Sequence, residues 1–221
     1  MLESVLATLH NATTLLFGVY ISAAFLGVRM NRRNVFTLFG FSCAVGILYI
    51  FSFLLWGESC SEKIYPLIIH LPLVLFLTLY YKYKPMLSVL SVITAYLCCQ
   101  ISKWVGLLAY SLRPEMWLYY TVRIVVTAVV FVVLLRYVSE ATAQLLQKPT
   151  RALVILGLMP LVYYVFDYIT GVYTQLLYSG REVVAEFLGF VLCITYILFL
   201  FMYFKQYEEK REAELRNQLM E

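Results

Sequence analysis

Four ionisable side chains interrupt otherwise apolar stretches in the second half of the sequence. They are Lys103, Arg123, Asp167 and Glu186. A charge inside a membrane helix is costly unless it faces a protein interior or a water-filled cavity and finds a partner, so each residue is a candidate functional group. Two cations and two anions can form ion pairs that fix the helix register, or can bind a small polar or zwitterionic ligand. The sequence leaves both interpretations open.

The neighbours of these charges support a shared interior face. At spacings of three and four residues each charge is followed or preceded by polar or small side chains, such as Gln100 beside Lys103 and Tyr119 beside Arg123. Small residues let membrane helices approach closely, and polar ones find partners between helices. We therefore predict a pocket with charged and aromatic walls. Its predicted ligand-binding residues are Asp167, Lys103, Arg123, Glu186, His70, Tyr164, Tyr168 and Trp104.

The elements that must position these residues are membrane helices. The chain has 221 residues, of which 62% are hydrophobic and 14% charged, and its mean hydropathy is +0.81. Soluble domains average roughly 45–50% apolar and 25% charged residues. The composition predicts an integral membrane protein, and the net charge of +4 indicates loop topology and not a nucleic-acid partner.

Seven apolar runs are long enough to cross a bilayer, which takes about 20 residues. We predict an all-α, polytopic fold with seven transmembrane helices. The runs are Val5–Val28, Val35–Trp56, Ile64–Tyr81, Met86–Tyr110, Trp117–Tyr137, Ala152–Leu177 and Val183–Phe204.

The basic residues predict the orientation, because short cytoplasmic loops carry an excess of Lys and Arg. The loops after the first, third, fifth and seventh runs hold Arg29, Arg32, Arg33, Lys82, Lys84, Arg136, Lys148, Arg151, Lys205, Lys210, Arg211 and Arg216. The alternate loops hold Lys63, Arg113 and Arg181. This asymmetry predicts the N-terminus outside and the C-terminus inside.

The depth of the charges follows from a rise of about 1.5 Å per residue. All four lie in the outer halves of their helices, and His70 does too. Asp167 is the deepest, at roughly 15 Å from the outer end of its run. The predicted pocket therefore opens to the outside.

The sequence changes character after residue 204. The stretch 205–221 is rich in charge and has opposite charges four residues apart, for example at Lys205 and Glu209 and at Lys210 and Glu214. We predict that residues 1–204 form the membrane domain and that 205–221 continue the seventh helix into the cytoplasm.

Catalysis has little support in the sequence. Metal-protease, nucleophile-elbow and phosphate-loop motifs are lacking, so we expect no catalytic residues and no enzyme activity. Four of the five cysteines lie in apolar runs, and Cys60 is placed in a loop, a pattern that predicts neither a disulfide framework nor a metal site. No cofactor is expected.

Three segments carry a resemblance to a known family. They are YPLIIHLPLVLFLTLYYK (Tyr65 to Lys82), TAYLCCQISKW (Thr94 to Trp104) and PLVYYVFDYITGVYTQLLYSGREVVAEFLGF (Pro160 to Phe190). Followed by a charged helix, they resemble the N-terminal membrane sensor region of GHKL-type histidine kinases of Firmicutes and, more distantly, the Agr-type peptide-pheromone receptor kinases.

The resemblance implies a function. In that family six or seven helices detect an extracellular signal, and the exit helix leads to a dimerisation helix with the phospho-accepting His and to an ATP-binding domain. Neither His10 nor His70 lies after the last run, and the 221 residues hold no ATP-binding segment. The resemblance implies a receptor for an extracellular small molecule or peptide in the plasma membrane of a bacterial cell. It also implies a homodimer formed through the C-terminal helix, which signals to a kinase module outside this sequence and then to a response regulator.

Two other functions stay open. A substrate-binding membrane subunit of a small-molecule transporter has similar length and hydrophobicity, but predicts a compact cytoplasmic surface without a long exit helix. A structural or assembly protein is the other, in which the charges only hold helices together.

Overall fold

The computed structural model describes residues 2–146, 150–169 and 182–220. Every regular element in these ranges is helical, which confirms the all-α class for the part of the chain described. The elements are α1 (Leu2–Phe25), α2 (Arg32–Trp56), α3 (Glu58–Tyr65), a π-helical segment (Pro66–His70), α4 (Leu71–Leu79), α5 (Pro85–Leu112), α6 (Met116–Val133), a second π-helical segment (Leu134–Val138), α7 (Ser139–Leu145), α8 (Thr150–Asp167) and α9 (Glu182–Met220).

Five helical stretches are long and apolar enough to cross a membrane, so the chain is a membrane protein. They are Leu2–Phe25, Arg32–Trp56, Cys60–Leu79, Pro85–Leu112 and Met116–Leu145. Large apolar side chains are exposed all along α2, from Phe36 to Trp56, where a bilayer would cover them. The sixth predicted run lies in α8 up to Asp167, and its residues 170–177 lie outside the described part of the structure. The seventh predicted run lies within α9. That the sixth and seventh runs cross the membrane stays a prediction.

Several helix ends differ from the prediction. A left-handed Gly57, with φ of 77°, ends α2, and a helical turn begins again at Glu58, six residues before the predicted start. Cys60 therefore lies on a helix and not in a loop. The fifth helix continues through α7 to Leu145, beyond the predicted end at Tyr137, because no Gly or Pro interrupts the chain there.

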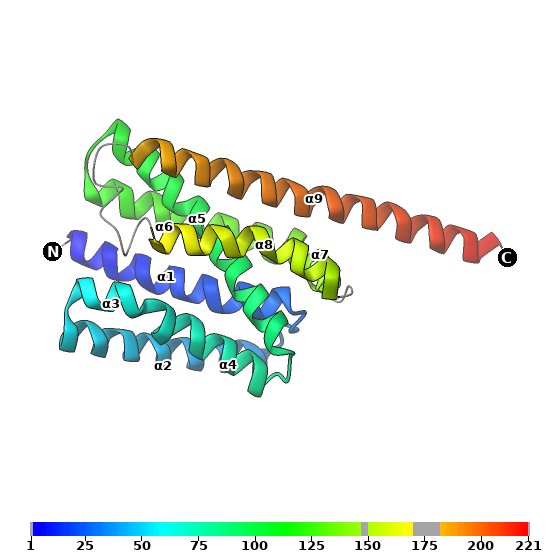
Figure 1. Ribbon diagram of the computed structural model, residues 1–221, viewed down its shortest axis with the longest axis horizontal. Coiled ribbons are helices and arrows are strands. Elements are labelled where there is room, and N and C mark those ends of the chain that lie inside the picture. Colours follow the sequence, from blue (N-terminus) through cyan, green and yellow to red (C-terminus); the bar gives the residue numbers. More distant parts are fainter. Residues whose placement is uncertain (1, 147–149, 170–181, 221) are drawn as a thin grey trace.

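The bundle is organised around α5, which contacts α1, α4, α6, α8 and α9. Figure 1 shows α5 crossing the bundle obliquely while α2, α3 and α4 lie together at one side. Helices α1, α5 and α6 pack against one another, and α2 packs at the edge against α1 and α3. The interior contains a continuous apolar cluster that includes Phe17, Phe25, Leu77 and Leu97.

Helix α9 is the longest element, with 39 residues from Glu182 to Met220. It runs unbroken through the start of the charged stretch at Lys205, so the predicted continuation of the seventh run as one helix is confirmed. In Figure 1 it extends well past the end of the bundle. Residues 209–218 are exposed along it.

Candidate functional site

A cavity of about 510 Å³ lies between the helices. Ligand sites for small molecules typically measure about 300–1,000 Å³. Its walls come from α1, α2, α3, α4, α5, α6 and the end of α8, with the first π-helical segment between α3 and α4. Its polar and aromatic lining residues are His10, Asn11, Thr14, Ser22, Tyr49, Glu62, Tyr65, His70, Tyr96, Gln100, Lys103, Tyr119, Arg123, Asp167 and Tyr168.

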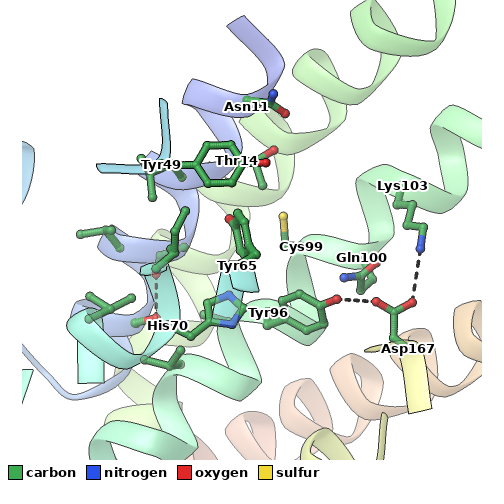
Figure 2. Close-up of a pocket in the computed structure, with 18 of the residues that line it drawn as sticks. Asn11, Thr14, Tyr49, Tyr65, His70, Tyr96, Cys99, Gln100, Lys103 and Asp167 are labelled. Atoms are coloured by element: carbon green, nitrogen blue, oxygen red, sulfur yellow. Dashed lines mark hydrogen bonds and ion pairs between the residues drawn. The ribbon is translucent and has the colours of Figure 1, made fainter. Parts of the chain in front are cut away.

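Asp167, the last residue of α8, pairs with Lys103 of α5. The Lys103 Nζ lies 3.3 Å from Asp167 Oδ1, and the Tyr96 hydroxyl donates a short hydrogen bond to Asp167 Oδ2 (Figure 2). The side chains are 28% exposed for Lys103 and 13% for Asp167. Since residues 96, 99, 100 and 103 lie on one face of α5, the two groups that bind the carboxylate come from the polar stripe that the sequence shows. Both carboxylate oxygens are therefore engaged by α5.

Arg123 of α6 lies on another wall of the same cavity. Its Nη1 donates a 2.7 Å hydrogen bond to the Tyr119 hydroxyl, and its guanidinium carbon lies 5.1 Å from the centre of the Tyr119 ring. The buried Nε has no hydrogen-bond partner among the described residues. The aliphatic stem of Arg123 packs on Gly106 so closely that a Cβ there would lie 2.5 Å from Arg123 Cγ. A side chain at position 106 of α5 would therefore displace the stem of Arg123.

His70 ends the first π-helical segment and lies among four tyrosines. Its Nδ1 is 2.7 Å from the Tyr164 hydroxyl in a hydrogen bond. Its ring centroid is 5.2 Å from Tyr65, 5.4 Å from Tyr96, 5.4 Å from Tyr164 and 6.4 Å from Tyr168. Figure 2 shows His70 next to Tyr65 and Tyr96. These contacts tie α8 to α5 and to the π-helical segment.

The π-helical segment has a local cause. Pro66 begins it and Pro72 follows it, and neither residue has a backbone N–H to donate to the regular ladder. Where backbone hydrogen bonds of the α-helix are already missing, a change to the wider π-helical turn costs less free energy. Such turns are frequent at functional sites. As a result both Ile69 and His70 line the cavity from one turn of helix.

The predicted site residues fall into three groups. Asp167, Lys103, Arg123, His70 and Tyr168 all line the cavity. Two others, Tyr164 and Trp104, are not in its lining: Tyr164 binds His70, and Trp104 is buried with Lys103 Nζ 5.7 Å from its ring centre. The backbone of Glu186 belongs to α9, but its side chain lies outside the described part of the structure.

A stripe on α1 is the part of the wall that the sequence interpretation missed. His10, Thr14 and Ser22 follow one another at intervals of four and eight residues and all line the cavity. The four-residue spacing was visible in the sequence. His10 is buried, 4% exposed, and its ring lies 6.0 Å from that of Tyr120. Glu62 and Tyr65, on α3, complete the wall that the sequence assigned to a loop and the start of a run.

The cavity is lined by both charged and neutral polar side chains. Within the described ranges, no three His, Cys, Asp or Glu side chains gather closely enough to hold a metal ion. The groups present are the Lys103–Asp167 ion pair, the guanidinium of Arg123, the carboxylate of Glu62, two imidazoles, two amides, hydroxyls and tyrosine rings. Such a set is suited to a polar ligand with an apolar or aromatic part.

Comparison of the chain with known protein families, curated proteins and solved structures gives no match. The resemblance to sensor kinases therefore stays a prediction that rests on the three sequence segments.

Proposed function

We propose that this chain is the receptor module of a signalling protein in the bacterial plasma membrane. It has seven spans, with the N-terminus outside and the C-terminus inside. A small polar molecule or peptide binds in the cavity from the outside, and α9 carries the response to a histidine kinase module. A dimer formed through the C-terminal helix and a downstream response regulator are part of this proposal.

The single observation that carries the proposal is the combination of a charged cavity with an uninterrupted exit helix. Asp167, which lies in the cavity wall, is the last residue of α8, the described helix before α9. At about 1.5 Å per residue, α9 is roughly 58 Å long, about twice the hydrocarbon thickness of a bilayer. A long rigid helix can transmit a change in helix packing at the cavity to a domain at its far end.

The same helix argues against the transport alternative. A substrate-binding transport subunit predicts a compact cytoplasmic surface, whereas residues 209–218 of α9 are exposed on a helix that leaves the bundle. The receptor interpretation accounts for this extension.

Insertions in α9 test the proposed output. With the full chain fused after Glu221 to the cytoplasmic part of a GHKL-type kinase, alanines inserted after Gln206 rotate the output helix by about 100° each. One or two alanines are expected to change autophosphorylation in membrane vesicles by about fivefold or more. Seven alanines nearly restore the helical phase and are expected to restore the activity. Equal activity in all three variants would contradict signalling through α9.

Labelling of Cys60 tests the proposed orientation. Cys60 is exposed on α3, near the end of the bundle that we place outside, whereas Cys98 is buried. In intact cells a membrane-impermeant maleimide is expected to label the protein, and Cys60→Ser is expected to abolish that labelling. If Cys60 reacts only after the cells are lysed, the orientation is the reverse of the proposed one.

A further inference from the structure

Unsatisfied polar atoms gather around the cavity. Four buried side-chain atoms of its lining residues have no hydrogen-bond partner among the described residues. They are His10 Nδ1, Thr14 Oγ1, Gln100 Oε1 and Arg123 Nε. They come from three different helices, α1, α5 and α6. More than about 90% of buried polar groups in proteins have a partner. Their concentration at one cavity indicates that its walls are built to bond a polar molecule.

The charges of the cavity favour an anion over a cation. Asp167 already pairs with Lys103 and accepts a hydrogen bond from Tyr96, so its negative charge is compensated within the protein. Among the described residues, Arg123 forms a hydrogen bond only with a neutral hydroxyl, that of Tyr119, and no carboxylate forms an ion pair with it.

The remaining carboxylate in the lining does not change this balance. Glu62 is an exposed residue on α3, and solvent weakens the interaction of an exposed charge with groups inside the cavity. A guanidinium presents several N–H donors in a planar fork that matches a carboxylate. Arg123 is therefore the group in the cavity best suited to hold a ligand's charge.

We infer that the cavity binds a molecule whose terminal carboxylate accepts hydrogen bonds from Arg123, whose neighbouring amide N–H donates to Gln100, and whose aromatic side chain packs among the tyrosines of the wall. Tyr49, Tyr65 and Tyr119 supply that aromatic wall. The shared chemistry is that of an N-acylated aromatic amino acid or the C-terminal residue of a short peptide. The inference rests on the proposed function only for access from the outside.

Matched acids and amides test the inference on the unmodified chain. The purified full chain in lipid nanodiscs is heated with N-acetyl-L-phenylalanine or with the peptide Ala-Ala-Phe, each at about 10 mM, and tryptophan fluorescence reports Tm. Both acids are expected to raise Tm by a few degrees, since a ligand that binds only the folded state stabilises it. Their C-terminal amides are expected to have no effect. A larger shift from the peptide identifies a peptide as the source, and a larger shift from the single residue identifies a small molecule.

Two results would overturn the inference. One is an equal increase in Tm from the acids and the amides, which would show that the carboxylate is not recognised. The other is no shift from either acid. Both comparisons use the native chain, so they decide the matter even where a variant fails to fold.

Variants locate the contact. Arg123→Gln is expected to weaken binding of the better acid by about tenfold or more, because charge-assisted hydrogen bonds are lost. Arg123→Lys keeps the charge without the fork and is expected to have an intermediate affinity. Arg113→Gln is the matched control: Arg113 is exposed, pairs with Glu115 and does not line the cavity, so its loss is expected to leave affinity unchanged. An equal loss in Arg113→Gln and Arg123→Gln would contradict the assignment.

The outcomes separate this inference from the proposed function. The acids could bind while the insertions in α9 leave kinase activity constant. That result would support the carboxylate site and refute the receptor output. A phase-dependent insertion series without any effect of the acids would refute the ligand chemistry alone.

Discussion

Replacing Asp167 with leucine is expected to lower the free energy of unfolding by about 3 kcal/mol, in the range for breaking one partner of a buried ion pair. The substitution leaves Lys103 without a counter-charge, although its side chain is only 28% exposed. It also leaves the hydroxyl of Tyr96 without its acceptor. Unfolding of the purified chain in mixed micelles with a rising fraction of SDS measures the change.

The double variant Asp167→Leu with Lys103→Met isolates the cause. Because it removes both charges, it is expected to recover most of the loss, as replacing a whole buried pair by apolar residues is often neutral. The exposed pair Arg113–Glu115 is the control, since its side chains are 65% and 35% exposed. Its disruption by Glu115→Gln is expected to cost less than about 1 kcal/mol. If the single and double variants at Asp167 and Lys103 were equally unstable, the lost charge balance would not be the cause.

The substitution His70→Ala is expected to lower the free energy of unfolding by about 3 kcal/mol. This is typical of removing a large side chain from a packed interior. The imidazole contacts four tyrosine rings, and its Nδ1 forms the hydrogen bond to Tyr164. Its removal leaves a void between α8 and α5 and removes the hydrogen bond between His70 and the Tyr164 hydroxyl. The same unfolding measurement in mixed micelles applies.

Tyr164→Phe separates packing from hydrogen bonding at this point. It keeps the ring and removes only the hydroxyl, so it is expected to cost about 1 kcal/mol. A loss for Tyr164→Phe equal to that for His70→Ala would assign the whole effect to the hydrogen bond. It would contradict a role for the aromatic contacts.

The charged part of the site could be predicted from the sequence, because burying a charge in a membrane is so costly that its position is informative. The sequence predicts that Lys103 and Asp167 belong to one pocket, although they are 64 residues apart. The structure pairs them. Hydropathy alone likewise located the five helices that can cross a membrane. The choice of Lys103 over Arg123 as the partner of Asp167 depends on how α5, α6 and α8 pack, which no local pattern contains.

The neutral part of the site could not be predicted with the same approach. His10, Thr14 and Ser22 carry no formal charge when the imidazole is neutral, so burying them gives a weaker signal than a lysine or an aspartate. Trp104 was predicted to be part of the aromatic wall of the pocket, but it follows Lys103 directly, and successive helical residues point about 100° apart. The indole is accordingly buried beside the lysine and away from the cavity lining.

The central position of α5 affects how the chain enters the membrane. In its most apolar 18-residue window 61% of the residues are buried, against 22% or fewer in the other four candidate spans. Neighbouring helices shield it from lipid, so it can carry the polar side chains of Gln100 and Lys103 inside the bundle. During synthesis, however, α5 is made before α6 and α8, and a chain interrupted after Leu112 would present those polar groups to hydrocarbon. Stable insertion of this helix therefore depends on segments that the ribosome has yet to make.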